Sequence, residues 1–322
     1  MSLPPIPVTV LTGFLGAGKT TLLRYMLQAE HGLKLAVIEN EISETPIDGQ
    51  LLGDQPVELL TLANGCVCCS IHVELEKALF LLLDKRDAGE LDFERLVIEC
   101  TGLADPAPVA QTFFATEELA LRYMLDGIVT LVDAVNAERH LQETIAQAQV
   151  GFADRILLSK TDLASPEQLD TLAARLARIN SRAPQRVVEH GQIDLAELLD
   201  IRGFNLDADV APAPRLRPLV PVGKSADRIR TLVLRSEQPL DMQRLSAFME
   251  DLLERHGNSL LRYKGVLAVT DDERRLVFQG VLRLYGFDWD EPWGADEPRE
   301  SVMVFIGDDL PEDEIRAGFA QL

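Results

Sequence analysis

The first 200 residues alternate short apolar runs with longer segments whose apolar residues recur every three or four positions. The apolar runs are nearly continuous, as in strands that are covered on both faces of a sheet, and they predict strands over 8–12, 35–39, 95–99, 127–133 and 155–160. The periodic segments predict helices over 20–30, 73–86, 137–150 and 166–180. This alternation indicates an α/β fold with a mostly parallel sheet, in which ligands bind beyond the carboxyl ends of the strands.

The pattern changes near residue 205. Residues 207–223 are rich in proline and predict a linker. The later apolar runs predict strands over 229–236, 265–269, 276–287 and 301–307, with helices over 241–257 and from Pro311 onward. We therefore expect an N-terminal domain over 1–206, a linker over 207–223 and a smaller α+β domain with a partly antiparallel sheet over 224–322.

Composition narrows the functional classes. The chain has 322 residues, enough for one large or two ordinary domains, and a formal net charge of −21. Such an acidic surface argues against nucleic acid or an anionic membrane as the main partner. No apolar run approaches the ~18 residues that a membrane-spanning helix needs, and the N-terminus lacks the pattern of a signal peptide. We expect a cytoplasmic protein, in which clustered cysteines stay reduced and favour metal binding or catalysis over disulfides.

The segment GFLGAGKTT (13–21) matches the phosphate-binding pattern G-x-x-x-x-G-K-[ST] between a predicted strand and a predicted helix. Its glycines let backbone amides surround phosphate groups, and the helix N-terminus adds partial positive charge. We expect Lys19 to reach the β- and γ-phosphates and the Thr20 hydroxyl to bind Mg²⁺. The segment predicts a P-loop NTPase whose nucleotide contacts come from Gly13, Gly16, Ala17, Gly18, Lys19, Thr20 and Thr21.

Two later motifs extend this site. In LVIECTG (96–102), Glu99 ends a strand as a Walker B carboxylate does, and the Gly102 amide is placed to sense the γ-phosphate. Leu103 stands where Ras-like GTPases carry the glutamine that orients the attacking water. We therefore expect slow intrinsic hydrolysis, or the use of another group such as Glu39, Glu41 or Asp105.

The motif SKTD (159–162) follows another predicted strand and is a variant of Asn-Lys-x-Asp. Asp162 can accept hydrogen bonds from guanine N1 and N2, and adenine offers no such pair of donors. Lys160 is expected to lie over the base, and Ser159 replaces the usual asparagine. The motif favours GTP over ATP, although Lys-x-Asp also occurs as ordinary turn chemistry.

Three of the four cysteines, Cys66, Cys68 and Cys69, lie within four positions. Metal binding is the favoured interpretation, because thiolates bind soft or borderline ions such as Zn²⁺. A redox pair and buried apolar packing stay open, although the segment lacks the Cys-x-x-Cys of a redox helix. For Cys100, buried apolar packing is the favoured interpretation.

The segments VIENE, NGCVCCS, VIECTGLADP, SKTD, LLRYKG and LVFQGVLRLYG resemble those of the CobW-type metal-linked P-loop GTPases, whose relatives include UreG and HypB. The resemblance covers both domains and implies a cytosolic zinc-binding GTPase that serves as a metallochaperone or metalloprotein activator. It also implies a metal site built from Cys68, Glu39 and Glu44, with Cys66 and Cys69 as auxiliary ligands. In ENEISE (39–44), isoleucine and serine replace the family's phenylalanine and glycine just before Glu44.

The resulting hypothesis is a GTPase that couples GTP binding and hydrolysis to zinc transfer, with GTP/GDP, Mg²⁺ and Zn²⁺ as ligands and a client metalloprotein as partner. Metal binding would bias the same loops that the γ-phosphate orders, so the two ligands would be reciprocally coupled. Two alternatives stay open: a phosphotransferase acting on a small molecule, and a non-enzymatic zinc sensor with a structural nucleotide. The sequence does not determine the oligomeric state, and a homodimer stays open.

Overall fold

The described part of the chain forms two compact units. The computed structural model describes residues 4–29, 32–40, 58–61, 71–199, 201, 227–294 and 297–322. One unit falls within 1–175 and 183–205, and the other within 176–182 and 206–322. The predicted linker, 207–223, lies outside the described residues, so the predicted domain boundaries stay a prediction.

The N-terminal unit contains a seven-stranded sheet in the order β3-β2-β4-β1-β5-β6-β7. Every neighbouring pair of strands is parallel, which confirms the fold class expected from the alternating sequence. The strands are β1 (Ile6–Gly13), β2 (Leu35–Asn40), β3 (Glu58–Thr61), β4 (Arg95–Cys100), β5 (Tyr123–Asp133), β6 (Arg155–Ser159) and β7 (Gln185–Val188). Because all strands run the same way, their carboxyl ends lie along one edge of the sheet.

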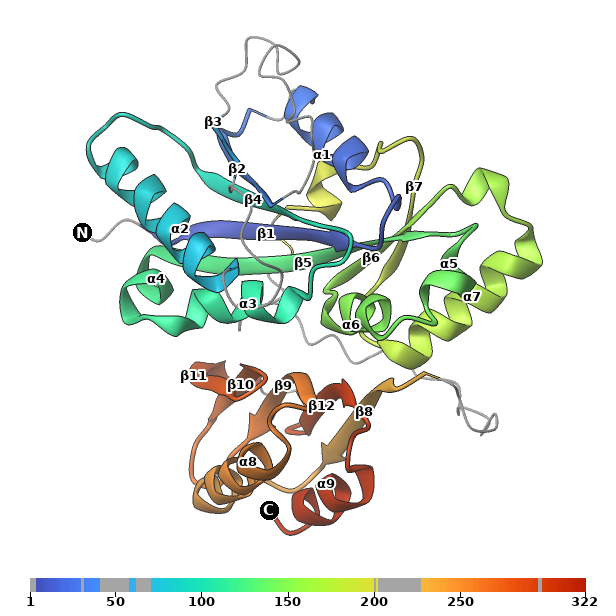
Figure 1. Cartoon of the computed structure of the whole chain (residues 1–322). Helices are drawn as coiled ribbons and strands as arrows, with labels where there is room; N and C mark the ends of the chain where they lie inside the picture. The colour runs from blue at the N-terminus through green and yellow to red at the C-terminus, as the bar shows by residue number, and fades with distance from the viewer. Residues whose placement is uncertain are drawn as a thin grey trace. The chain divides into compact units, whose positions relative to one another are not determined.

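Helices cover both faces of this sheet, with α1 on one side and α2, α3 and α6 on the other (Figure 1). The helices are α1 (Lys19–Gln28), α2 (Ile71–Asp87), α3 (Pro106–Ala115), α4 (Glu117–Arg122), α5 (Ala137–His140), α6 (Thr144–Phe152) and α7 (Pro166–Ile179). Apolar residues of α1, such as Leu22, Leu23 and Met26, share one buried cluster with residues of the central strands. No helix in the described ranges is both long and apolar enough to cross a membrane.

The helix predicted over 137–150 is wrong as a single element, because α5 ends at His140 and α6 begins at Thr144. Glu143 is extended, with ψ of 129°, and it precedes the first residue of α6. The side chain of Gln147 donates a 2.9 Å hydrogen bond to the carbonyl of Leu141. The carbonyl at the end of α5 has no amide partner within that helix, and this buried hydrogen bond supplies one. The break between the helices therefore leaves this carbonyl hydrogen-bonded.

The C-terminal unit contains a five-stranded sheet in the order β11-β10-β9-β12-β8, and every described pair in it is antiparallel. Its elements are β8 (Ile229–Ser236), α8 (Met242–His256), β9 (Leu260–Ala268), β10 (Arg274–Val281), β11 (Leu284–Pro292), β12 (Ser301–Asp308) and α9 (Glu312–Phe319). Tyr263, Phe278 and Phe305 form the aromatic centre of its core, into which α8 and α9 also place apolar residues. This is the α+β architecture that the sequence predicted.

Candidate functional site

The loop between β1 and α1 has a backbone that requires glycine. Gly13, Gly16 and Gly18 have φ angles of 138°, 73° and 100°. A Cβ atom at Gly13 would lie 2.3 Å from the carbonyl oxygen of Leu131 in β5, so no larger residue fits there. The loop leads into the ten-residue helix α1, whose first amides point to where an anion binds.

Lys19 opens α1 with its side chain turned back into this loop. Only 8% of the residue is exposed. Its Nζ donates to the carbonyl of Gly13 at 2.8 Å and to that of Phe14 at 3.4 Å. The fold therefore holds the Lys19 ammonium group inside the loop, where it can neutralise the charge of bound phosphates.

A hydroxyl at the start of α1 and two glutamates of neighbouring strands lie at the carboxyl ends of β2 and β4. Thr20 Oγ1 donates a 2.8 Å hydrogen bond to Glu99 Oε1. Glu39 lies directly opposite Glu99 in the pairing of β2 with β4, and the two glutamates are only 5% and 4% exposed. Oxygen ligands of this kind suit Mg²⁺, so the residues present fit the ion that the sequence analysis predicted.

The loop after β4 lies tightly against the phosphate loop. A Cβ atom at Gly102 would lie 2.7 Å from the backbone nitrogen of Leu15, so glycine is required at this contact. Leu103 is 54% exposed and offers no polar atom for a water molecule.

The other groups considered for orienting the water differ in their surroundings. Asp105 caps α3 by accepting a 2.9 Å hydrogen bond from the Ala107 amide, and burial raises its pKa. Glu39 is buried beside Glu99, whereas Glu41 lies outside the described residues. The Asp105 carboxylate is therefore already used to begin a helix.

The SKTD motif lies at the carboxyl end of β6. Ser159 is buried, and its hydroxyl donates a 2.8 Å hydrogen bond to the carbonyl of Ala17 in the phosphate loop. Lys160 has a φ of 57°, and Asp162 follows in the short 3₁₀-helix η2 (Thr161–Leu163), where it is exposed. The motif thus joins the phosphate loop through Ser159 and presents the Asp162 carboxylate to solvent.

Asp133, at the end of β5, is a member of the site that the sequence analysis missed. Its carboxylate accepts a 2.6 Å hydrogen bond from Lys160 Nζ and a 2.9 Å bond from the Asn136 side chain. Burial disfavours its charged form, but the hydrogen bonds from Lys160 and Asn136 outweigh burial and lower its pKa. The missed signal is an acidic residue that ends a predicted strand, as Glu99 does.

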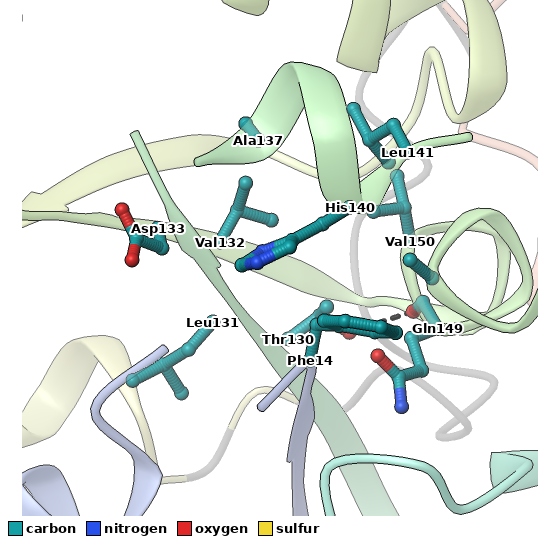
Figure 2. Close-up of a pocket in the computed structure, with 11 residues that line it drawn as sticks. Phe14, Thr130, Leu131, Val132, Asp133, Ala137, His140, Leu141, Gln149 and Val150 are labelled. Carbon is teal, nitrogen blue, oxygen red and sulfur yellow. Dashed lines mark hydrogen bonds between the residues drawn. The ribbon is translucent and has the colours of Figure 1, made fainter. Parts of the chain in front are cut away.

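A small pocket beside the phosphate loop collects further buried polar residues (Figure 2). The ring of His140 lies against that of Phe14, with centroids 4.6 Å apart, and burial lowers the pKa of His140. Gln149 and Thr130 line the same pocket. The cavity of about 10 Å³ offers space for one water molecule. A glutamine in a helix or a threonine in a strand has many ordinary uses, so the sequence alone does not mark Gln149 and Thr130 as residues that line a pocket.

The predicted zinc ligands fall mostly beyond what the structure describes. Glu44, Cys66, Cys68 and Cys69 lie outside the described residues, so the ligand set stays a prediction. Within the described ranges, no group of three or more His, Cys, Asp or Glu side chains could hold a metal ion. Cys100 is fully buried as expected, and burial raises its pKa to about 12, so it behaves as a small apolar side chain.

Comparison with known proteins agrees with this geometry. Residues 7–186 match the family described as CobW/HypB/UreG, nucleotide-binding domain, and residues 229–322 match the cobalamin synthesis protein cobW C-terminal domain. The chain is 53% identical to the zinc chaperone YjiA of Escherichia coli over 320 residues, which cover 99% of each protein. It is 31% identical to the zinc chaperone CobW of Pseudomonas aeruginosa, over 97% of this chain and 90% of that protein.

A solved structure extends the match to three dimensions. The crystal structure of Zn(II)-bound YjiA GTPase from E. coli superposes with a TM-score of 0.83 and 49% sequence identity, and the match covers 99% of both chains. Sequence and structure agree over both units. The chain therefore belongs to the CobW/HypB/UreG family of nucleotide-binding proteins and carries the CobW C-terminal domain.

Proposed function

We propose that this protein is a zinc-binding GTPase that acts as a metallochaperone or metalloprotein activator. In this proposal GTP is hydrolysed to GDP and phosphate, and the nucleotide state controls the transfer of zinc to a client metalloprotein. The observation that carries the nucleotide part is the Lys19 ammonium fixed in the glycine loop beside the Thr20–Glu99 hydrogen bond. The relatives that the chain covers almost completely support the zinc part, because they are named zinc chaperones.

The phosphate end of the site would work chiefly by placing positive charge. Lys19 and the amides at the start of α1 bind the phosphates and stabilise the charge that develops on them. Thr20 and Glu99 would hold Mg²⁺, which supplies further neutralisation of the phosphate oxygens. Since Leu103 presents no polar group that could orient water, intrinsic hydrolysis should be slow, or should use another group such as Glu39, Glu41 or Asp105.

The base end of the site would select guanine. Asp162 is exposed and can accept hydrogen bonds from two guanine nitrogens. Lys160 cannot move freely, because Asp133 binds its ammonium group. The hydrogen bond from Ser159 to Ala17 connects the SKTD motif to the phosphate loop. The segment that would bind the base is therefore bonded directly to the segment that would bind the phosphates.

Zinc is the cargo in this proposal, bound by Cys68 with Glu39 and Glu44, while Cys66 and Cys69 pass the ion on or complete its coordination. Glu39 supplies the link to the nucleotide, because it lies opposite Glu99 in the sheet. A change in the charge bound near one glutamate alters the electrostatic environment of the other. Zinc and GTP must then influence each other's binding by the same factor.

The first test is GTP turnover by the purified protein with and without one equivalent of zinc, with ATP as the matched control nucleotide. We expect slow phosphate release from GTP that needs no added acceptor, little release from ATP, and a rate that responds to zinc. Phosphate transfer only in the presence of a small-molecule acceptor would identify a phosphotransferase. One retained nucleotide without turnover would identify a zinc sensor.

The second test is calorimetric titration of zinc into apo, GDP-bound and non-hydrolysable-GTP-bound protein. We expect the zinc affinity to differ between the nucleotide states by about 1–3 kcal/mol. It should weaken in Cys68→Ala and as the pH falls below neutrality, since thiolate ligation releases protons. Equal affinity in all three states would leave a zinc site without a switch, and full affinity in Cys68→Ala would show that the ligand set is wrong.

A further inference from the structure

A buried glutamine connects α6 to the loop that follows β4. Gln149 is 1% exposed, and its Nε2 donates to the carbonyl of Gly102 at 3.2 Å and to that of Ala104 at 3.1 Å. Two carbonyl acceptors require the nitrogen of the amide, because the amide oxygen cannot donate. One side chain therefore binds two carbonyls of the segment 101–104.

The position of Gln149 is itself fixed. Its backbone carbonyl accepts a 2.7 Å hydrogen bond from the buried hydroxyl of Thr130 in β5. In Figure 2 its side-chain oxygen points toward the side of the pocket where Phe14 lies, and its nitrogen points away. Gln149 is thus attached to the central sheet at one end and to the loop at the other.

The bound segment lies tightly against the phosphate loop. Gly102 lies against Leu15 so closely that a Cβ atom would clash with its backbone. The segment closes on itself through a 3.0 Å hydrogen bond from the Ala104 amide to the Thr101 carbonyl. The Thr101 carbonyl belongs to the same planar peptide unit as the Gly102 amide, so the bond from Ala104 and the two bonds from Gln149 together hold the turn that carries this amide.

We propose that Gln149 is a positioning residue that holds segment 101–104 ready to receive the γ-phosphate. This inference rests on the proposed function, because it uses Gly102 as the γ-phosphate sensor. A preorganised donor loses less conformational entropy when the ligand binds and stabilises transition-state charge better. GDP lacks the γ-phosphate, so its affinity should not depend on Gln149. The residue thus contributes to telling GTP from GDP.

The same helix offers a matched control. Gln147 is also buried, at 4% exposure, and its Nε2 donates to a carbonyl, but that carbonyl belongs to Leu141. Replacing either glutamine by methionine preserves volume and removes the donor. Both variants should lose thermal stability, because Gln149→Met removes a donor from two buried carbonyls and Gln147→Met removes one from the carbonyl of Leu141. Only Gln149→Met should alter the response to the γ-phosphate.

The experiment compares wild type, Gln149→Met and Gln147→Met by titration with GDP and with a non-hydrolysable GTP analogue, and by kcat and KM for GTP. For Gln149→Met we expect the analogue affinity and kcat/KM to fall about tenfold, as two hydrogen bonds of ordinary strength imply, with GDP affinity unchanged. For Gln147→Met the ratio of GTP to GDP affinity should equal that of wild type. Gln149→Asn, one methylene shorter, is the substitute if the methionine variant fails to fold.

Hydrogen–deuterium exchange of the nucleotide-free proteins separates this inference from the proposed function. Amides of segment 101–104 should exchange faster in Gln149→Met than in wild type and Gln147→Met. If wild type fails to bind GTP, the proposed function is wrong, and the exchange result alone decides whether Gln149 positions the segment. Equal exchange in all three proteins, or equal losses of GTP and GDP affinity in Gln149→Met, would reduce Gln149 to a structural residue and overturn the inference.

Discussion

The two sheets of this protein place their buried polar side chains very differently. In the parallel sheet, Glu39, Glu99, Asp133 and Ser159 all lie at or next to the last residue of a strand, so they meet at one edge. In the described antiparallel sheet neighbouring carboxyl ends point in opposite directions, and the buried side chains of Arg262 and Ser301 lie toward opposite ends of the β9–β12 pair. The parallel sheet brings reactive polar side chains together at one edge, whereas the antiparallel sheet contributes chiefly an aromatic core.

Lys19→Ala gives the sharpest test of the idea that the parallel sheet carries the nucleotide site and the antiparallel sheet does not. It removes the fixed ammonium group, so we expect GTP turnover to fall about a thousandfold, as for the loss of a strong charge-stabilising group, while the melting temperature barely changes. The measurements are phosphate release and thermal unfolding. Lys34→Ala is the matched control, because Lys34 is an exposed lysine that pairs with Asp92. Near-normal turnover in folded Lys19→Ala would refute the assignment of this loop.

Phe305→Ala tests whether the antiparallel sheet contributes stability and not nucleotide binding. Phe305 is fully buried and packs 6.1 Å, centroid to centroid, from Tyr263. Loss of a buried phenylalanine should destabilise the C-terminal unit by about 3–5 kcal/mol, with GDP affinity unchanged. Denaturant unfolding and GDP titration measure the two effects. Phe287→Ala is the control, because Phe287 is 50% exposed. A loss of GDP affinity in folded Phe305→Ala would contradict the separation of chemistry from stability.

The sequence predicted the parallel sheet because strands covered on both faces are nearly continuous apolar runs. It did not predict α3, whose segment PAPVAQTFFA begins with prolines, which are disfavoured inside a helix. Pro106 is tolerated because it occupies the first turn, where no amide hydrogen bond is lost, and Asp105 caps the helix. The break after α5 was missed for a different reason: the bond from Gln147 to Leu141 is a tertiary detail inside an otherwise periodic segment.

The residues of the candidate site differ in the same way, because some could be predicted from the sequence and others could not. Lys19, Thr20 and their glycines are adjacent in sequence, and their pattern alone predicted a phosphate loop. The Asp133–Lys160 pair joins residues 27 positions apart, and the bond from Gln149 to Gly102 spans 47 positions. Such pairs arise only when the strands are placed in their final order. Motifs therefore predicted the residues expected to touch the nucleotide, but not the residues that orient them.

Asp162→Asn tests whether the base end is as specific as the phosphate end. The amide that replaces the carboxylate no longer accepts two guanine hydrogen bonds but can donate to the O2 of xanthine. We expect the GTP affinity to fall about a hundredfold, as for the loss of hydrogen bonds to a charged group, with a gain for xanthosine triphosphate. Competition titration measures both. Asp170→Asn, an exposed substitution in α7, controls for the change in charge. Equal ATP and GTP affinity in wild type would remove the guanine assignment.

Ser159→Ala should have the smallest effect, because it removes a connection within the framework and no direct contact with a charged ligand. The variant loses the 2.8 Å hydrogen bond to Ala17, and the carbonyl of Ala17 then lies buried without that donor. Affinities for GTP and GDP should both fall about fivefold, as one neutral hydrogen bond implies. The ratio between the two affinities should stay constant, since Ser159 bonds the loop that both nucleotides share and not the segment that meets the γ-phosphate. Ser159→Thr keeps the hydroxyl and should retain most of the affinity in the same titrations. A selective loss of GTP affinity in Ser159→Ala would show that the base end and the γ-phosphate end are coupled more tightly than their separate contacts imply.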